Sequence, residues 1–307
     1  MHIIRYGTPN GTGARVGVIA EDGVVRRLAV QSLAALLRLR LTEIRALVER
    51  PAEREPEPVR LLPPIDGLTE VWAAGVTYRR SREARREESS VADVYSLVYE
   101  AARPEVFFKS PAWRVCGDGE PIGIRPDSAV DVPEPELALV LNSAGETVGL
   151  TVCDDVSSRS IEGENPLYLP QAKIYSGSCA LGPGIRPAWE VPDVTALPIT
   201  VRVLRGTGIA WQGDTSTALL HRELDDLVEH LRRCLDFPDG AVLSTGTGLA
   251  PELSFTLAER DVVEIEVGGV GTLRNPVLSA RAELFGWLAD GPARVAPVLL
   301  DEDGSGR

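Results

Sequence analysis

Lysine and histidine are scarce in this chain. Of its 32 basic residues only Lys109 and Lys173 are lysines, and its histidines are His2, His221 and His230. The composition therefore disfavours a histidine as general base and a metal site built from several histidines. A lysine ammonium can lose its proton near neutral pH, whereas a guanidinium cannot. The presence of lysine in a chain this rich in arginine therefore indicates a role in proton transfer more strongly than chance.

Cysteines and long apolar runs are also few. The four cysteines (Cys116, Cys153, Cys179, Cys234) lie far apart without a C-x-x-C spacing. This argues against a zinc knuckle or a disulfide framework and favours reduced thiols in the cytoplasm. No apolar run approaches about 18 residues, so we expect no membrane span. The first residues lack the basic-then-apolar pattern of a signal peptide, so we expect no secretion.

The net charge of −13 excludes non-specific binding to nucleic acid, which needs a basic face. An anionic substrate remains compatible with this charge, because a bound divalent metal can reverse the local potential.

The chain predicts an α+β protein, mostly β, with two parts. Residues 2–29 alternate like short antiparallel strands, and residues 31–48 carry leucines at helical spacing. A proline-rich linker follows at residues 51–67. We therefore expect a small N-terminal domain over residues 1–65 and a catalytic domain over residues 66–300.

Two further helices are expected in the larger part. The charge-rich residues 81–102 suggest a helix with a solvated face. Residues 216–237 predict an amphipathic helix that starts at Ser216. Its apolar stripe comprises Leu219, Leu220, Leu224, Leu227 and Leu231.

The stretch 132–183 carries the most informative pattern. Glu134 and Glu136 lie two apart on an alternating run, which places them on one face of a strand with the leucines facing the core. Pro135 predicts an edge or a bulge there. Asp155 follows nineteen residues after Glu136, and Lys173 eighteen residues later. Three carboxylates with one amine suit Mg²⁺ or Mn²⁺ beside a 2-keto acid.

An E-x-E pair alone is equally typical of an exposed strand face. Glu264 and Glu266 form such a pair without a following aspartate and lysine, and we expect them on the solvent face.

Other side chains are weaker candidates. Glu105 lies among apolar strand residues, which suit a general acid or base, although an ordinary strand position is as good an interpretation. Thr245, Gly246 and Thr247 offer hydroxyls and backbone N–H groups to a substrate carboxylate, or form a simple turn.

Several motifs together resemble the fumarylacetoacetate hydrolase superfamily between about residues 71 and 276. They are GVTY, FFKSP, the E-x-E strand, DDV at Asp155, AK at Lys173 with SGSCALGP, STGT at Thr245, and GVGTLRNPV. The resemblance implies a mixed β-sandwich roll and a homodimer or homotetramer. It also implies Mg²⁺ held by Glu134, Glu136 and Asp155.

The chain departs from the hydrolytic members at one position. Those members share a Y-x-x-H-x-x-E element, and here Ser81 stands where its histidine would be, three residues after Tyr78. Since serine cannot replace that base, C–C hydrolysis is not expected. The resemblance is greater to the 2-keto-3-deoxy-pentonate dehydratases of the superfamily. It implies Lys173 and Glu105 as catalytic groups, and we assign Tyr78, Ser81 and Lys109 to substrate binding.

The implied reaction is Mg²⁺-dependent dehydration of a 2-keto-3-deoxy-pentonate to 2,5-dioxopentanoate, in pentose catabolism. Which of Lys173 and Glu105 is base and which is acid stays open. The alternatives are acylpyruvate hydrolysis, oxaloacetate decarboxylation, dienoate isomerisation, or binding of a keto acid without turnover.

Overall fold

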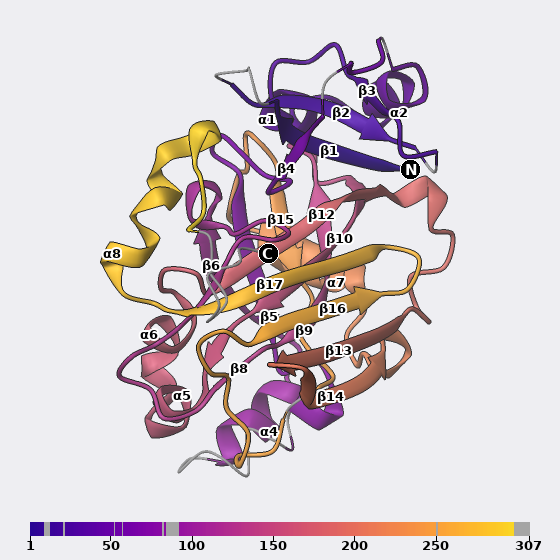
Figure 1. Ribbon diagram of the computed structural model, residues 1–307. Helices are drawn as coiled ribbons and strands as arrows, with labels where there is room; N and C mark the ends of the chain where they lie inside the picture. The colour runs from indigo at the N-terminus through magenta and orange to yellow at the C-terminus, as the bar shows by residue number, and fades with distance from the viewer. Residues whose placement is uncertain are drawn as a thin grey trace.

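The computed structural model describes residues 1–8, 13–20, 22–51, 53–56, 58–81, 83, 92–249 and 251–297, with the backbone alone for residues 92–95. In these ranges more residues lie in strands than in helices, so the α+β class with mostly β-structure is confirmed (Figure 1).

A ten-stranded mixed sheet forms the centre of the molecule. Its order is β3-β2-β1-β12-β10-β9-β15-β5-β6, with β4 paired to β1. Neighbours are antiparallel except β15 and β5. The strands are β1 (His2–Gly7), β2 (Arg15–Ile19), β3 (Val25–Arg27), β4 (Arg60–Leu62), β5 (Glu70–Gly75), β6 (Glu105–Pro111), β9 (Pro135–Leu141), β10 (Thr147–Asp155), β12 (Cys179–Pro187) and β15 (Ala241–Ser244).

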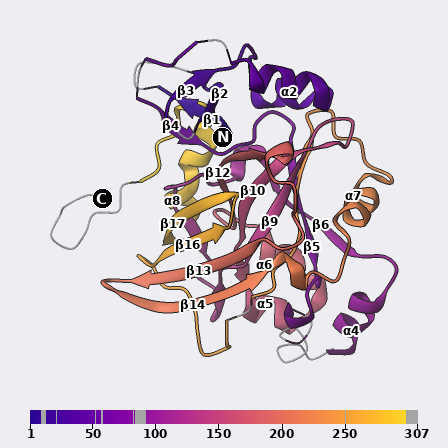
Figure 2. The same ribbon diagram turned by 90° about the vertical axis from the view of Figure 1, so that its right-hand side faces the viewer.

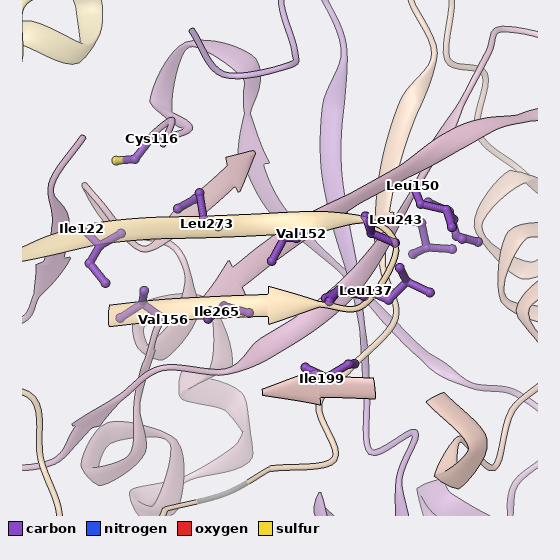
Figure 3. Close-up of a cluster of buried hydrophobic side chains, with 14 of the residues drawn as sticks. Cys116, Ile122, Leu137, Leu150, Val152, Val156, Ile199, Leu243, Ile265 and Leu273 are labelled. Carbon is purple, nitrogen blue, oxygen red and sulfur yellow. The ribbon is translucent and has the colours of Figure 1, made fainter. Parts of the chain in front are cut away.

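A second sheet covers one face of the first. Its order is β14-β13-β16-β17-β7. Its strands are β7 (Ile122–Ile124), β13 (Pro198–Arg205), β14 (Gly208–Ser216), β16 (Val262–Val267) and β17 (Gly271–Ser279). Figure 3 shows Leu137 and Val152 of the large sheet with Ile199 and Ile265 of the second, all in one buried cluster. The apolar residues between the two sheets form the larger core.

Helices cover the other face of the large sheet. Ala138 and Val140 of β9 pack in one cluster with leucines of α1 (Leu33–Leu37) and with Ile44 of α2 (Leu41–Glu49). The prediction that the β9 leucines face the core is confirmed, but the opposite face is buried as well. β9 therefore lies between two apolar layers, and all seven of its residues are buried.

The position of Pro135 differs from the expected edge. β9 lies between β10 and β15, so the strand as a whole is interior. Pro135 is its first residue, and β15 pairs only from Ala138 onward. Because Pro135 has no partner in β15, its lack of an N–H removes no hydrogen bond between β9 and β15.

Short helices follow the ends of β9 and β10. A small two-stranded sheet of β8 (Asp131–Val132) and β11 (Ser157–Ser158) leads into α5 (Arg159–Glu164), η2 (Pro166–Tyr168) and α6 (Leu169–Lys173). α5 packs against α6 beyond the ends of these strands (Figure 2). This brings residues from the segment 159–173 over the carboxylate-bearing strand ends.

The helix predicted over residues 216–237 is shorter than expected. α7 spans only Leu224–Arg232, and Ser216 caps the separate turn η4 (Thr217–Leu219). Leu219 is 64% exposed, so its place in the apolar stripe is wrong. The reason is tertiary pairing: the N–H of His221 donates to the carbonyl of Thr77, and Leu220 bridges to Tyr78. These contacts keep residues 220–223 out of the helix.

The other predicted elements can be compared directly. The N-terminal strands and the helices within residues 31–48 are confirmed. Glu264 and Glu266 alternate with buried residues on the outer face of β16, as expected. Of the helix over residues 81–102, α4 (Ala92–Glu100) is present, and residues 82 and 84–91 lie outside the described part.

The remaining elements are short. They are η1 (Ala112–Arg114), η3 (Ala188–Glu190), α8 (Ala282–Phe285) and η5 (Gly286–Ala293). Among the described residues, no helix combines the length and apolarity needed to cross a membrane. The division at residue 65 stays a prediction; β1 and β4 of the first part join the large sheet through the pairing of β1 with β12.

Candidate active site

Three carboxylates meet where β9 and β10 pair. Glu136 lies opposite Cys153, and the N–H of Asp155 donates to the carbonyl of Glu134 at 3.0 Å. This register brings Glu134, Glu136 and Asp155 together, with one oxygen of each within 4.8 Å of the others. All three are buried. Glu134 and Glu136 therefore lie close together, as their period-two spacing predicts, and the pairing of β9 with β10 adds Asp155.

Three cations neutralise this buried negative charge. Lys173 Nζ donates to Glu134 Oε2 at 2.5 Å and to Asp155 Oδ2 at 3.0 Å. Arg159 Nη2 donates to Glu134 Oε1 at 2.8 Å, and Lys109 forms an ion pair with Asp155 Oδ1. Buried carboxylates require such partners because desolvation of an isolated charge is costly.

Glu136 is held by a different set of donors. Its Oε2 accepts from Ser244 Oγ at 2.5 Å and from the N–H of Gly246 at 2.7 Å. Burial, followed by the charges of Asp155 and Glu134, raises the pKa of Glu136 to about 8. Close negative charges of this kind favour either a proton or a metal cation at the cluster.

The donor set fits a hard divalent cation. Three carboxylates offer oxygen ligands only, which suit Mg²⁺ or Mn²⁺ better than Zn²⁺. The Lys173 ammonium already bonds two of the three carboxylates, which shows that this position attracts positive charge. The residues present therefore fit a divalent metal.

Glu105 enters the same pocket from β6. Its Cα partner in the sheet is Gly75, and a Cβ at Gly75 would lie 2.1 Å from Glu105 Oε2. The absence of a side chain at residue 75 lets the Glu105 carboxylate lie against β5. Phe107, two residues on, lies beneath Lys173, whose Nζ is 5.9 Å from the ring centroid.

Two backbone positions beside the pocket adopt the left-handed conformation. Gly246 has φ 89°, and a Cβ there would lie 2.0 Å from Thr77 Oγ1. Val76 has φ 53°, which is unfavourable for a β-branched residue. Such conformations persist where the surrounding structure holds them, commonly at functional sites.

The structure brings most of the predicted site residues into one pocket. Its lining includes Glu136 and Asp155 of the triad together with Glu105, Lys173, Ser81, Gly246 and Thr247, whereas Glu134 lies outside the lining and contacts it through Lys173.

Three predicted substrate-binding residues lie behind this lining. Lys109 is fully buried and also donates to the carbonyl of Lys173 at 2.5 Å. Thr245 Oγ1 donates to the carbonyl of Leu137 at 2.8 Å. Tyr78 is buried, and desolvation raises its pKa. These contacts position the pocket wall.

Ser81 lines the pocket, but its hydroxyl bonds the backbone of Tyr78. Its hydroxyl donates to the carbonyl of Tyr78 at 2.7 Å and accepts from the N–H of Tyr78 at 3.2 Å. None of the described residues in the pocket lining is a histidine.

Sequence reasoning missed several groups at the site. Arg159 and Ser244 bond carboxylates of the triad, and Glu162 lines the pocket. Asp154 Oδ1 accepts from the N–H of Glu134 at 3.0 Å, and burial raises its pKa to about 8. Arg159 and Glu162 stand close after the D-D-V motif, which was the one available signal. Ser244 contacts Glu136 across 108 residues of chain; it begins the S-T-G-T motif, but the motif does not predict this contact.

The chain is similar in sequence to a known family and to several of its members. The family model described as fumarylacetoacetate (FAA) hydrolase C-terminal matches residues 70–278. A probable 2-keto-3-deoxyxylonate dehydratase of Haloferax volcanii is 50% identical over 214 residues, which cover 70% of this chain and 73% of that protein. The 2-dehydro-3-deoxy-D-arabinonate dehydratase of Saccharolobus solfataricus is 42% identical over 228 residues, covering 73% and 76%.

A solved structure is similar over most of the chain. It is a 2-keto-3-deoxy-D-arabinonate dehydratase complexed with magnesium and 2,5-dioxopentanoate. Its TM-score is 0.80 at 34% identity, covering 92% of this chain and 100% of that one.

Proposed function

The chain belongs to the fumarylacetoacetate hydrolase family, and on this basis we propose that it is a Mg²⁺-dependent dehydratase. Its substrate would be a 2-keto-3-deoxy-pentonate and its product 2,5-dioxopentanoate, within pentose catabolism. The observation that carries the proposal is a carboxylate triad bonded by Lys173, two members of which line one pocket with Lys173 and Glu105. The two dehydratase relatives and the structure with magnesium and product support it.

Glu134, Glu136 and Asp155 would hold the Mg²⁺, with Mn²⁺ as a substitute. When bound, the metal supplies positive charge for the substrate's C1 carboxylate and C2 carbonyl, which makes the C3 protons more acidic. Arg159 and Lys109 would keep two of the ligands oriented through their bonds to Glu134 and Asp155.

Lys173 and Glu105 would share the proton transfers. One removes a proton from C3, and the other protonates the C4 hydroxyl as the C4–O bond breaks, so that a C3–C4 double bond forms and water leaves. Protons then shift from C5 and its hydroxyl to C3 and C4, which leaves carbonyls at C2 and C5. Both side chains line the pocket beside the triad.

The hydrolytic alternative has less support. It needs a histidine base, whereas the Ser81 hydroxyl is bonded to the Tyr78 backbone. The three histidines lie elsewhere: His2 bonds the Val270 carbonyl, His221 stacks on Tyr99, and His230 bonds Asp226.

An NMR assay tests the proposal. The purified protein with Mg²⁺ is given 2-keto-3-deoxy-pentonates, acylpyruvates and oxaloacetate separately. We expect 2,5-dioxopentanoate from a pentonate and little change in the others. Cleavage of an acylpyruvate alone, or decarboxylation of oxaloacetate alone, would show that the protein has that activity and is not a dehydratase. Binding of a keto acid without turnover would leave a binding protein.

We also propose that the protein is a cytoplasmic homodimer or homotetramer. The family resemblance supports the oligomer, and the four free cysteines are compatible with a reducing compartment. Light scattering coupled to size-exclusion chromatography measures the mass directly. A monomer across the working concentration range would contradict the oligomer.

A further inference from the structure

A fourth carboxylate of the pocket lining has no role in the chemistry above. Glu162 lies on α5 and is only 4% exposed. The other carboxylates of the lining are Glu105, Glu136 and Asp155, which serve proton transfer or the metal. A buried carboxylate needs hydrogen-bond donors around it, and a hydroxyl group of a bound ligand is such a donor.

The orientation of Glu162 is set by its own helix. Arg159 precedes it by three residues, so both side chains lie on one face of α5. The ion pair of Arg159 with Glu134 turns that face toward the triad. Ser158 caps the helix by accepting from the N–H of Ile161, and Glu164, two residues beyond Glu162, is exposed. The helix thus presents Glu162 to the pocket and Glu164 to solvent.

The proposed substrate leaves one part of the molecule unassigned. The metal would take C1 and C2, while Lys173 and Glu105 would act at C3 and C4. The terminal C5 hydroxymethyl group remains. Glu162 comes from a covering helix, whereas the metal ligands come from the strand ends below it.

We propose that Glu162 is a specificity-determining residue, which accepts a hydrogen bond from the terminal hydroxyl and excludes 2-keto acids with a second carboxylate at that end. This inference rests on the proposed function and names how the same site selects its substrate. A hydroxyl donates to a buried carboxylate, whereas a second carboxylate meets a like charge in a desolvated space. Discrimination therefore comes from repulsion as well as attraction.

Three ligands of equal chain length isolate the effect. They are 2-oxopentanoate, 5-hydroxy-2-oxopentanoate and 2-oxoglutarate, which differ only in a methyl, hydroxymethyl or carboxylate group at C5. None carries the C4 hydroxyl, so none can be dehydrated. Their affinities are measured by calorimetry with Mg²⁺ present, after NMR correction for the cyclic form of the hydroxy acid.

We expect the wild-type protein to bind the hydroxy acid most tightly and 2-oxoglutarate most weakly. Glu162→Gln removes the charge at nearly constant size. It is expected to tighten 2-oxoglutarate binding by about tenfold, to weaken the hydroxy acid several-fold, and to leave 2-oxopentanoate unchanged. Glu164→Gln is the matched control on the same helix, with no change for any ligand.

Unchanged ratios among the three ligands in Glu162→Gln would overturn the inference. Glu162→Asp is the second variant, and it keeps the charge if the glutamine variant fails to fold. It should still exclude 2-oxoglutarate, and free entry of that ligand would show that size, not charge, decides.

Turnover of a 2-keto-3-deoxy-pentonate by the wild type is measured in parallel. Its absence would refute the proposed function alone, because the binding ratios do not depend on turnover.

Discussion

The Nζ of Lys109 donates a hydrogen bond to the backbone carbonyl of Lys173 at 2.5 Å, so the two lysines of the chain are direct neighbours. Both ammonium groups also form ion pairs with Asp155, on its two different oxygens. Lys109 is fully buried, while Lys173 reaches the pocket. Lys109 therefore holds the backbone of Lys173 beside Asp155.

Replacing Lys173 by arginine should keep the charge and abolish proton transfer. A guanidinium stays protonated near neutral pH, so we expect kcat to fall by about 100-fold or more. The measurement is the NMR assay with the pentonate, with circular dichroism as the check on folding. Near-normal turnover would show that Lys173 supplies only a positive charge and does not transfer a proton.

Replacing Lys109 by methionine should destabilise the protein. Loss of one partner from a buried ion pair costs about 3–5 kcal/mol; here Asp155 loses a cation, and the carbonyls of Val156 and Lys173 lose their donor. Urea denaturation measures the change. The control is Arg233→Met, which breaks an exposed pair with Glu229 and should cost no more than about 1 kcal/mol. Equal losses in both variants would contradict the structural role of Lys109.

Adding a methyl group at Gly75 should displace the Glu105 carboxylate. The new Cβ would lie 2.1 Å from Oε2, so Gly75→Ala is expected to lower kcat by about 10- to 100-fold with a smaller effect on KM. Gly286→Ala is the control, because a Cβ there meets nothing within 4 Å and the backbone is helical. An unchanged kcat in Gly75→Ala would show that Glu105 needs no such placement.

The stability of the metal-free protein should depend on pH through Glu136. Its pKa is raised from 4.5 to about 8 in the folded state, so folding favours the protonated form. This contribution is fully present below about pH 4.5 and is lost as the pH rises through about 8. Mg²⁺ binds the ionised form, so its stabilising effect should grow over the same range.

Thermal unfolding with EDTA and with Mg²⁺ at several pH values measures both effects. Glu136→Gln should flatten the metal-free dependence. A Mg²⁺ effect that shrinks as the pH rises from 5 to 8 would count against the triad as the metal site.

The closeness of the three carboxylates was predictable because it depends on local sequence information. A period of two determines that Glu134 and Glu136 share a face, and the hairpin between β9 and β10 returns Asp155 to them. The scarcity of lysine in the composition is enough to single out Lys173 as a candidate for proton transfer. These features depend on neighbours along the chain or in one hairpin.

Features that depend on distant contacts were missed or misjudged. Ser244 reaches Glu136 from another strand, and Gly75 makes room for Glu105 across a strand pair. Residues 220–223 lie in a helical apolar pattern, yet the pairing of Leu220 with Tyr78 and of His221 with Thr77 keeps them out of α7. Propensity is a weak guide where tertiary hydrogen bonds compete.

The burial of β9 on both faces has a consequence for how the activity is lost. Amide protons of an interior strand exchange with solvent only when most of the structure opens. Because Glu136 lies on β9 and Asp155 on its neighbour β10, the amides beside these carboxylates should be among the slowest to exchange. Fraying of β3 at the far end of the sheet would leave these carboxylates in place. The capacity to bind the metal should therefore persist through partial unfolding and disappear together with the cooperative loss of the central sheet.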